Sequence, residues 1–284
     1  MTQTPPIPQI ISASRRTDIP AFHTDWLLAA VRQGYARVPN PYTQREYEVS
    51  LQPIDVAAIV FWSRDYRPLL PHLDELDQRF GKRLVFHFTC TAFQPSARRI
   101  LEPALPPYEK RLSSLKQLAE RYGRDHIFWR FDPILFSNLS PPSERLATFR
   151  KLLPQMQQCT HRCFISFVDL YRKVRRRLQP LQQSGRLQLE TPTLAERIEF
   201  AWQLAGEARS YGIEVLSCCE EDIAAARAVP TGHCIDAPYL KRLFPEVDIP
   251  VQLYPSRKGC GCYRSRDIGR YGSCRHACLY CYAN

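Results

Sequence analysis

Residues 58–65 read AIVFWSRD, an unbroken apolar run that ends in a serine, an arginine and an aspartate. Short apolar runs rich in β-branched and aromatic residues are typical of buried strands. The chain contains six such runs, at residues 10–14, 58–63, 84–89, 127–131, 164–168 and 213–217. Each run is therefore predicted to be a strand of a buried sheet.

Helical patterns occupy the intervals between these strands. They cover residues 25–33, 68–80, 108–122, 144–158 and, most clearly, 194–211. In the last one, Thr193 and Glu196 form a capping-box pattern, and Gly212 is expected to end the helix. Its predicted core face consists of Leu194, Ile198, Trp202, Ala205 and Ala208.

Alternating strands and helices indicate parallel strands joined by right-handed crossovers. We therefore expect an α/β fold, a (β/α)6-type partial or closed barrel; an open doubly wound sheet is the alternative. Residues 1–222 are predicted to form the barrel core. Residues 223–284 are predicted to be a cysteine-rich iron–sulfur segment folded onto the barrel rim, within the same structural domain.

The last eleven residues read CRHACLYCYAN, which places Cys274, Cys278 and Cys281 in a C-x3-C-x2-C run. A [4Fe–4S] cluster needs four external ligands, one on each iron. Three cysteines therefore leave one iron open to a small molecule. Zinc ligation and structural or redox thiols are the alternatives for this run.

A second cysteine set comprises Cys218, Cys234, Cys260 and Cys262, with Cys219 as the alternative to its neighbour Cys218. Cys260 and Cys262 lie in the glycine-rich string GCGC at residues 259–262, where the small glycines allow close approach of the backbone to a metal cluster. Four thiolates could complete a second [4Fe–4S] cluster or a tetrahedral zinc site. Cys90, Cys159 and Cys163 are interpreted as packing residues.

Composition limits the possible partners. The 284 residues are 44% hydrophobic and 24% charged, with a formal net charge of +11 that suits an acidic partner. No apolar stretch reaches the roughly 18 residues of a membrane span, and the N-terminus lacks a secretory pattern. Eleven cysteines without such a signal favour a cytoplasmic protein that binds metal.

The chain resembles an uncharacterised bacterial family catalogued only as a domain of unknown function. The strings that carry this resemblance extend from position 12 to 284 and are SASRRTDIPAF, VFWSRD, RFDPI, ISFVDLYRK, GHCID, GCGC and CLYCYAN. The family's C-terminal cysteines are likened to the cluster loop of radical S-adenosylmethionine enzymes. CLYCYAN also looks like the corresponding loop of relatives of spore photoproduct lyase, which repair DNA.

The resemblance implies that Cys274, Cys278 and Cys281 hold a [4Fe–4S] cluster that binds S-adenosylmethionine, and that Tyr280 lies near the adenine. In that superfamily the motif normally follows the first strand, so its position here implies a circularly permuted barrel. The implied reaction forms a 5′-deoxyadenosyl radical on an unknown substrate, with an electron donor such as flavodoxin or ferredoxin. No catalytic residue is assigned.

Four rim residues are candidates for binding the cofactor. Arg15, Arg16 and Arg130 could bind its charged groups by bidentate hydrogen bonds, and Asp132 could accept ribose hydroxyls. A salt bridge between Arg130 and Asp132 is the structural alternative.

Two other functions remain open. The chain could be a non-catalytic or electron-transfer iron–sulfur protein. It could also bind or modify nucleic acid, because residues 172–177 read RKVRRR, five cations in six residues. A solvated helix face is the structural interpretation of this basic run.

Overall fold

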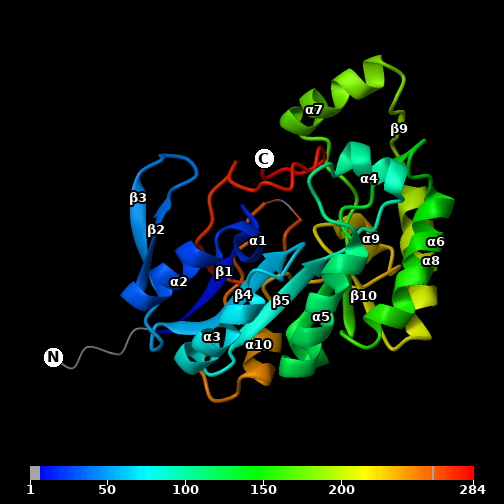
Figure 1. Ribbon diagram of the computed structural model, residues 1–284. Helices are drawn as coiled ribbons and strands as arrows, with labels where there is room; N and C mark the ends of the chain where they lie inside the picture. Colours follow the sequence, from blue (N-terminus) through cyan, green and yellow to red (C-terminus); the bar gives the residue numbers. More distant parts are fainter. Residues whose placement is uncertain (1–6, 258) are drawn as a thin grey trace. The chain divides into compact units, whose positions relative to one another are not determined.

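The computed structural model describes residues 7–257 and 259–284. Its sheet has seven parallel strands in the order β10-β8-β6-β5-β4-β1-β11 (Figure 1). This arrangement confirms the predicted α/β class with parallel strands.

All six predicted strands are present. They are β1 (Gln9–Ala13), β4 (Val56–Ser63), β5 (Leu84–Thr89), β6 (Ile127–Arg130), β8 (Arg162–Ile165) and β10 (Glu214–Ser217). The seventh strand, β11 (Arg266–Asp267), was not predicted, because two residues are too few to produce an apolar run. Two small antiparallel pairs were also missed: β2 (Tyr35–Pro39) with β3 (Glu46–Ser50), and β7 (Phe136–Ser137) with β9 (Leu189–Glu190).

The chain divides into two compact units, each made of two separate segments. The first unit contains Met1–His87 and His233–Cys274; the second contains Phe88–Gly232 and Arg275–Asn284. The segment 223–284, predicted to be cysteine-rich, contributes residues to both units.

In the first unit, the core forms around β4, whose residues are almost all buried. Its helices are α1 (Ile19–Phe22), α2 (Thr24–Gln33), α3 (Leu73–Phe80) after the 3-10 turn η1 (Leu70–His72), and α10 (Ala237–Leu243). The Phe61 ring of β4 stacks on that of Phe86 with 5.5 Å between centroids. Such aromatic contacts add to the burial of a strand that has no solvated face.

The second unit carries the longer helices. They are α4 (Pro95–Leu101), α5 (Tyr108–Tyr122), α6 (Pro142–Met156), α7 (Arg172–Gln183), α8 (Leu194–Arg209) and α9 (Glu221–Ala225), with the 3-10 turn η2 (Arg124–His126) before β6. Helices α6 and α8 pack together (Figure 1). Arg150 of α6 pairs with Glu207 of α8 at 2.6 Å on their surface. The Trp129 ring of β6 stacks on Phe149 of α6 at 4.9 Å.

Helix α8 confirms its predicted start but corrects its predicted core face. The Thr193–Glu196 capping box is formed. However, Leu194 and Trp202 are 43% and 66% exposed, and the buried residues are Phe200, Ala201, Leu204 and Ala208. Apolar residues occupy two sides of this helix at helical spacing, so only the tertiary contacts select which side is buried.

No helix within residues 7–257 and 259–284 combines the length and the apolar character of a membrane span. The prediction that the N-terminus lacks a secretory pattern concerns a segment whose first six residues lie outside the described part of the chain.

Candidate metal centre

Strand β11 brings the segment before the cysteine run to the first strand of the sheet. It pairs in parallel with β1, with Ile11 opposite Arg266 and Ser12 opposite Asp267. The Asp267 carboxylate accepts hydrogen bonds from Ser12 Oγ at 2.6 Å and from Ser14 Oγ at 2.7 Å. The pairing of only two residues is thus reinforced by side chains from the end of β1.

Arg15 and Arg16 lie in this same network. Arg16 Nε donates to Asp267 Oδ1 at 2.8 Å, and Arg16 Nη2 donates to the Asp267 carbonyl at 2.7 Å. The backbone amide of Arg15 donates to Asp267 Oδ2 at 2.9 Å. Both arginines therefore anchor β11, and their predicted role as cofactor ligands stays a prediction.

The electrostatics of this network favour an ionised carboxylate. Burial raises the pKa of Asp267, but the charges of Arg16 and Arg15 and the hydrogen bonds from Ser12 and Arg16 outweigh burial and lower it below its ordinary value. The ion pair is therefore formed at neutral pH.

After β11, the chain stays beside the end of β1 until it reaches Cys274. A Cβ atom at Gly269 would lie 1.9 Å from Ser14 Oγ, so only glycine permits this approach. Further along, Ser273 Oγ donates to Thr17 Oγ1 at 2.8 Å, and His23 Nε2 donates to the Ser273 carbonyl at 3.2 Å. The first cysteine of the run consequently follows a segment held at the carboxyl end of β1.

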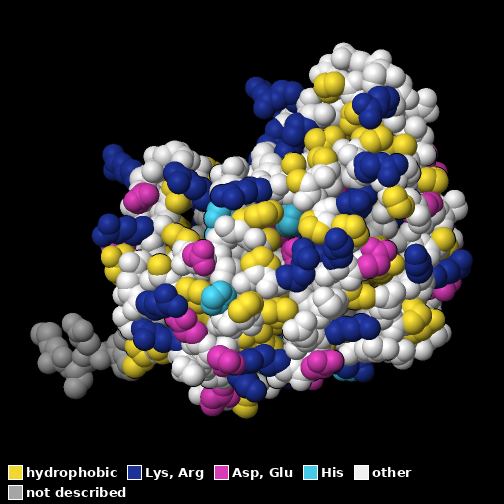
Figure 2. All heavy atoms as spheres, viewed as in Figure 1, with side chains coloured by type: hydrophobic (Ala, Val, Ile, Leu, Met, Phe, Trp, Pro, Cys, Tyr) yellow, Lys and Arg dark blue, Asp and Glu magenta, His cyan; other side chains and the backbone are white. Residues whose placement is uncertain are grey.

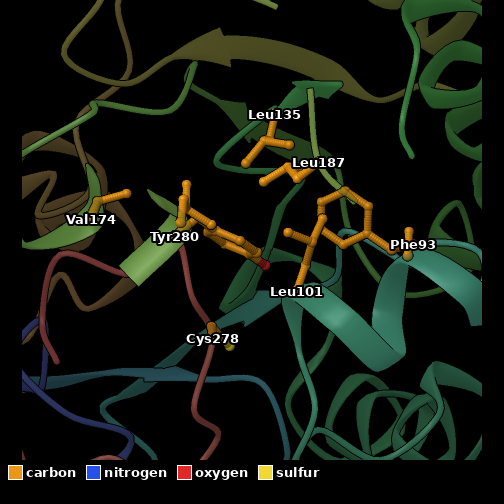
Figure 3. Packing of buried hydrophobic residues seen from close by; sticks show 9 residues of the cluster. Phe93, Leu101, Leu135, Val174, Leu187, Cys278 and Tyr280 are labelled. Carbon is orange, nitrogen blue, oxygen red and sulfur yellow. The ribbon is translucent and has the colours of Figure 1, made fainter. Parts of the chain in front are cut away.

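In the second unit, the rest of the cysteine run packs into an apolar cluster. Cys278 and Tyr280 are buried there with Leu101 of α4 and Val174 of α7 (Figure 3). The Leu279 amide donates to the Leu101 carbonyl at 2.9 Å. This packing anchors the tail against α4 and α7.

Tyr280 is held by both its ring and its hydroxyl. The ring meets Phe93 edge-on with 5.8 Å between centroids, and the hydroxyl donates to buried Glu102, which also accepts from Thr91 Oγ1 at 2.9 Å. Tyr280 therefore anchors the tail, and its predicted place near an adenine stays a prediction.

Three groups of Cys281 form hydrogen bonds: its carbonyl, its amide and its sulfur. Its carbonyl accepts from Arg177 Nη2, and its amide donates to the Cys278 carbonyl at 3.2 Å. The Ala283 amide donates to Cys281 Sγ at 3.3 Å. Hydrogen bonds to cysteine sulfur are among the contacts that tune iron–sulfur clusters.

The second cysteine set is partly assembled within the first unit. Hydrogen bonds with Cys234 and Cys260, followed by burial, raise the pKa of the Cys262 thiol. The Ile235 amide donates to Cys262 Sγ at 3.5 Å, and Ser256 Oγ donates to Cys260 Sγ at 3.3 Å. These three thiols are thus neighbours, and the sulfurs of Cys260 and Cys262 each accept a further hydrogen bond.

Cys218, the fourth predicted member of that set, follows β10 in the second unit. Arg130 Nη2 donates toward its Sγ at 3.6 Å. Arg130 also forms an ion pair with Asp132, with Nε donating to Oδ1 at 2.9 Å, and Asp132 accepts from Ser166 Oγ at 3.2 Å. The salt-bridge interpretation of Arg130 and Asp132 therefore describes this site; their binding of a cofactor stays a prediction.

All eleven cysteines lie in the described part of the chain, and none of them is in a disulfide. Burial raises the pKa of the Cys159 thiol to about 11 and that of Cys163 well above its usual value, which agrees with packing roles. The clustered cysteines of the C-terminal half are compatible with a metal or iron–sulfur site.

Within residues 7–257 and 259–284, no three His, Cys, Asp or Glu side chains form a group that could hold one metal ion. A [4Fe–4S] cluster differs from a single ion because each thiolate binds a different iron and the ligands need not converge on one point.

Two supporting residues were missed from the sequence. Asp267 bonds to Arg16 and so fixes the segment before the cysteine run, and Glu102 bonds to Tyr280 within the run. Asp267 stands seven positions before Cys274 with no motif around it. Only tertiary contacts identify either residue.

Comparison with known proteins yields one family match. Residues 10–283 match the model of the family described as Domain of unknown function (DUF1848). No curated protein matches the chain at a significant level, and neither does any solved structure.

Proposed function

The chain belongs to the DUF1848 family, and from its own cysteines we propose that it is an iron–sulfur protein of the radical S-adenosylmethionine type. The observation that carries this proposal is the run Cys274, Cys278 and Cys281, which supplies three thiols within eight residues. Three ligands leave one iron of a [4Fe–4S] cluster open to a substrate or cofactor.

The environment of the run supports this role. Cys278 is buried against an apolar cluster, and Cys281 Sγ accepts an amide donor. Burial limits access of water and oxygen to a cluster, and hydrogen bonds to its sulfurs tune its potential. When bound, such a cluster supplies the electron that cleaves S-adenosylmethionine to methionine and a 5′-deoxyadenosyl radical.

The protein residues have separate tasks in this proposal. The three cysteines of the run hold the cluster. Asp267 and Arg16 fix the segment that precedes the run, and Glu102 fixes Tyr280 within it. Cys234, Cys260 and Cys262, with Cys218 as a fourth ligand, would hold a second [4Fe–4S] cluster or a zinc ion.

We further propose that the sheet belongs to a partial (β/α) barrel that is circularly permuted relative to radical S-adenosylmethionine enzymes. The order of the sheet supports this. The cysteine run follows β11, an edge strand that neighbours β1, although β11 comes last along the chain. In the superfamily the motif normally follows the first strand, so a run that follows a neighbour of β1 supports the permutation.

The test is anaerobic reconstitution with iron and sulfide, followed by electron paramagnetic resonance with and without S-adenosylmethionine. Two clusters would give about eight irons and eight sulfides per chain. About four irons with one zinc would identify the second set as a zinc site. The reduced protein should convert S-adenosylmethionine to 5′-deoxyadenosine.

Three variants separate the roles of the cysteines. Cys278→Ala should abolish the cofactor-dependent change of the spectrum and the cleavage. Cys260→Ala should remove the second metal and leave that change in place. Cys159→Ala, at a packing cysteine, is the matched control and should keep both metals. Cleavage that persists in Cys278→Ala would contradict the proposal, and a full cluster that ignores the cofactor would favour electron transfer.

A further inference from the structure

Helix α7 presents a basic face that the fold itself leaves exposed. Its inner residues, Val174 and Leu178, are fully buried in the apolar cluster that also contains Cys278 and Tyr280. Arg172, Arg175 and Arg176 are exposed, and α7 contains no acidic residue. Figure 2 shows Lys and Arg side chains on the part of the surface that α7 forms.

The positions of these charges do not stabilise helix α7. Arg172 and Arg176 are four residues apart, and like charges at this spacing destabilise a helix. Arg172 also lies in the first turn, where the helix dipole disfavours cations. Among the described residues, no carboxylate forms an ion pair with Arg172, Arg175 or Arg176. Residues that violate local rules in this way are expected at binding sites.

Two exposed tyrosines border the basic face. Tyr171 directly precedes α7 and is 40% exposed, and Tyr282 of the C-terminal tail is 44% exposed. Their ring centroids are 6.5 Å apart. Aromatic rings beside a basic surface are the elements with which proteins bind single strands, because bases stack on the rings while cations bind the phosphates.

The geometry argues against the other polyanionic surfaces. A helix that binds a membrane surface inserts an apolar face into it. The apolar face of α7 is already buried in the protein through Val174 and Leu178. A nucleic acid duplex keeps its bases stacked inside, so the exposed rings of Tyr171 and Tyr282 would have no base to meet.

We propose that the face formed by Arg172, Arg175, Arg176, Tyr171 and Tyr282 binds single-stranded nucleic acid. This face is joined to the cysteine run, because Arg177 of α7 donates to the Cys281 carbonyl and Tyr282 follows Cys281 directly. A bound strand would therefore lie beside the run. Binding of the strand is independent of the proposed function. A role of the strand as the substrate rests on the proposed function.

The experiment measures binding of labelled oligo(dT) to the full-length reconstituted protein by fluorescence anisotropy over a series of salt concentrations. The triple variant Arg172→Ala, Arg175→Ala, Arg176→Ala should bind more weakly. Its salt dependence should be shallower by about 2 in slope, since each phosphate contact on a single strand contributes about 0.7. Tyr171→Ala and Tyr282→Ala should each weaken binding by about 5- to 150-fold.

The matched control removes three charges elsewhere, with Lys110→Ala, Lys116→Ala and Arg209→Ala on the exposed sides of α5 and α8. It should bind the strand as the parent protein does. Circular dichroism and iron content verify that every variant is folded.

Several outcomes overturn the inference: no binding by the parent protein, equal loss in the control, tighter binding to a duplex of the same sequence, or binding to phosphatidylserine vesicles through the same arginines. If the protein does not bind the strand but still cleaves S-adenosylmethionine, only this inference is wrong and the proposed function is unaffected. If the protein binds the strand but does not cleave S-adenosylmethionine, the nucleic acid surface is supported and the proposed function is wrong.

Discussion

At the scale of single residues, Asp267 decides whether the segment before the cysteines stays on the sheet. Its carboxylate is the shared acceptor for Ser12, Ser14 and Arg16. Its pKa is lowered, so the folded state binds fewer protons there than the unfolded chain near pH 4. The stabilisation is therefore complete above the unfolded pKa of about 3.9 and is lost as the pH falls through the lower, folded pKa.

Asp267→Asn should lower the free energy of unfolding by about 3–5 kcal/mol at pH 7, because Arg16 is left as a buried, uncompensated charge. The difference from the parent should shrink as the pH falls below about 4, because the carboxylate is protonated first in the unfolded chain, and it should shrink further as the pH passes the lowered pKa of the folded protein. Urea unfolding at a series of pH values measures this difference. Asp248→Asn is the control, since Asp248 is exposed and pairs with Lys241 only at 3.8 Å. A pH-independent difference at Asp267 would contradict the assignment.

At the scale of elements, β11 is a strand that exists because of its neighbours. Two residues cannot form a stable strand alone, and β11 depends on β1 and on the close approach at Gly269. The same dependence holds for the tail, whose Leu279 amide and Tyr280 hydroxyl bond to Leu101 and Glu102 at the end of α4.

Gly269→Ala should destabilise the protein by about 1–3 kcal/mol, because its Cβ would overlap Ser14 Oγ. Hydrogen exchange should increase in the peptides that contain β11 and Ser273. Gly206→Ala is the matched control: it lies within α8 with nothing near its Cβ, so alanine there should stabilise the protein by up to about 1 kcal/mol. Equal effects of the two changes would refute the steric argument.

At the scale of the whole molecule, the core of the sheet is built from apolar side chains, apart from the cysteines that are predicted to bind metal. Strands β4 and β5 are buried through apolar side chains, and the tail packs through Tyr280 and Cys278 into an apolar cluster. This differs from small metal domains, which unfold when the metal is removed because they have no other core.

Removal of the iron by a chelator and an oxidant should therefore leave the far-ultraviolet circular dichroism nearly unchanged. Hydrogen exchange should increase around Cys234, Cys260 and Cys262 and in the terminal run, where the ligands would lose their constraint, but not in β4. Cooperative unfolding of the sheet on metal removal would show instead that the metal is required for the fold.

The amino-acid sequence by itself determined six of the seven strands of the parallel sheet, the major helices and the identity of the cysteines. These features depend on local patterns: an apolar run such as 58–63 is buried in any α/β fold, and the C-x3-C-x2-C spacing sets which thiols can share a cluster. The start of α8 was also predictable from a local pattern, because its capping box lies within four residues.

Only the tertiary structure decided the rest. The apolar side of α8 that faces the core, the pairing of β11 with β1, and the roles of Asp267 and Glu102 all depend on residues far apart in the chain. Ser12 and Asp267 are 255 positions apart. No local pattern encodes such a contact, because its free energy comes from burial and from hydrogen bonds that form only when the chain has folded.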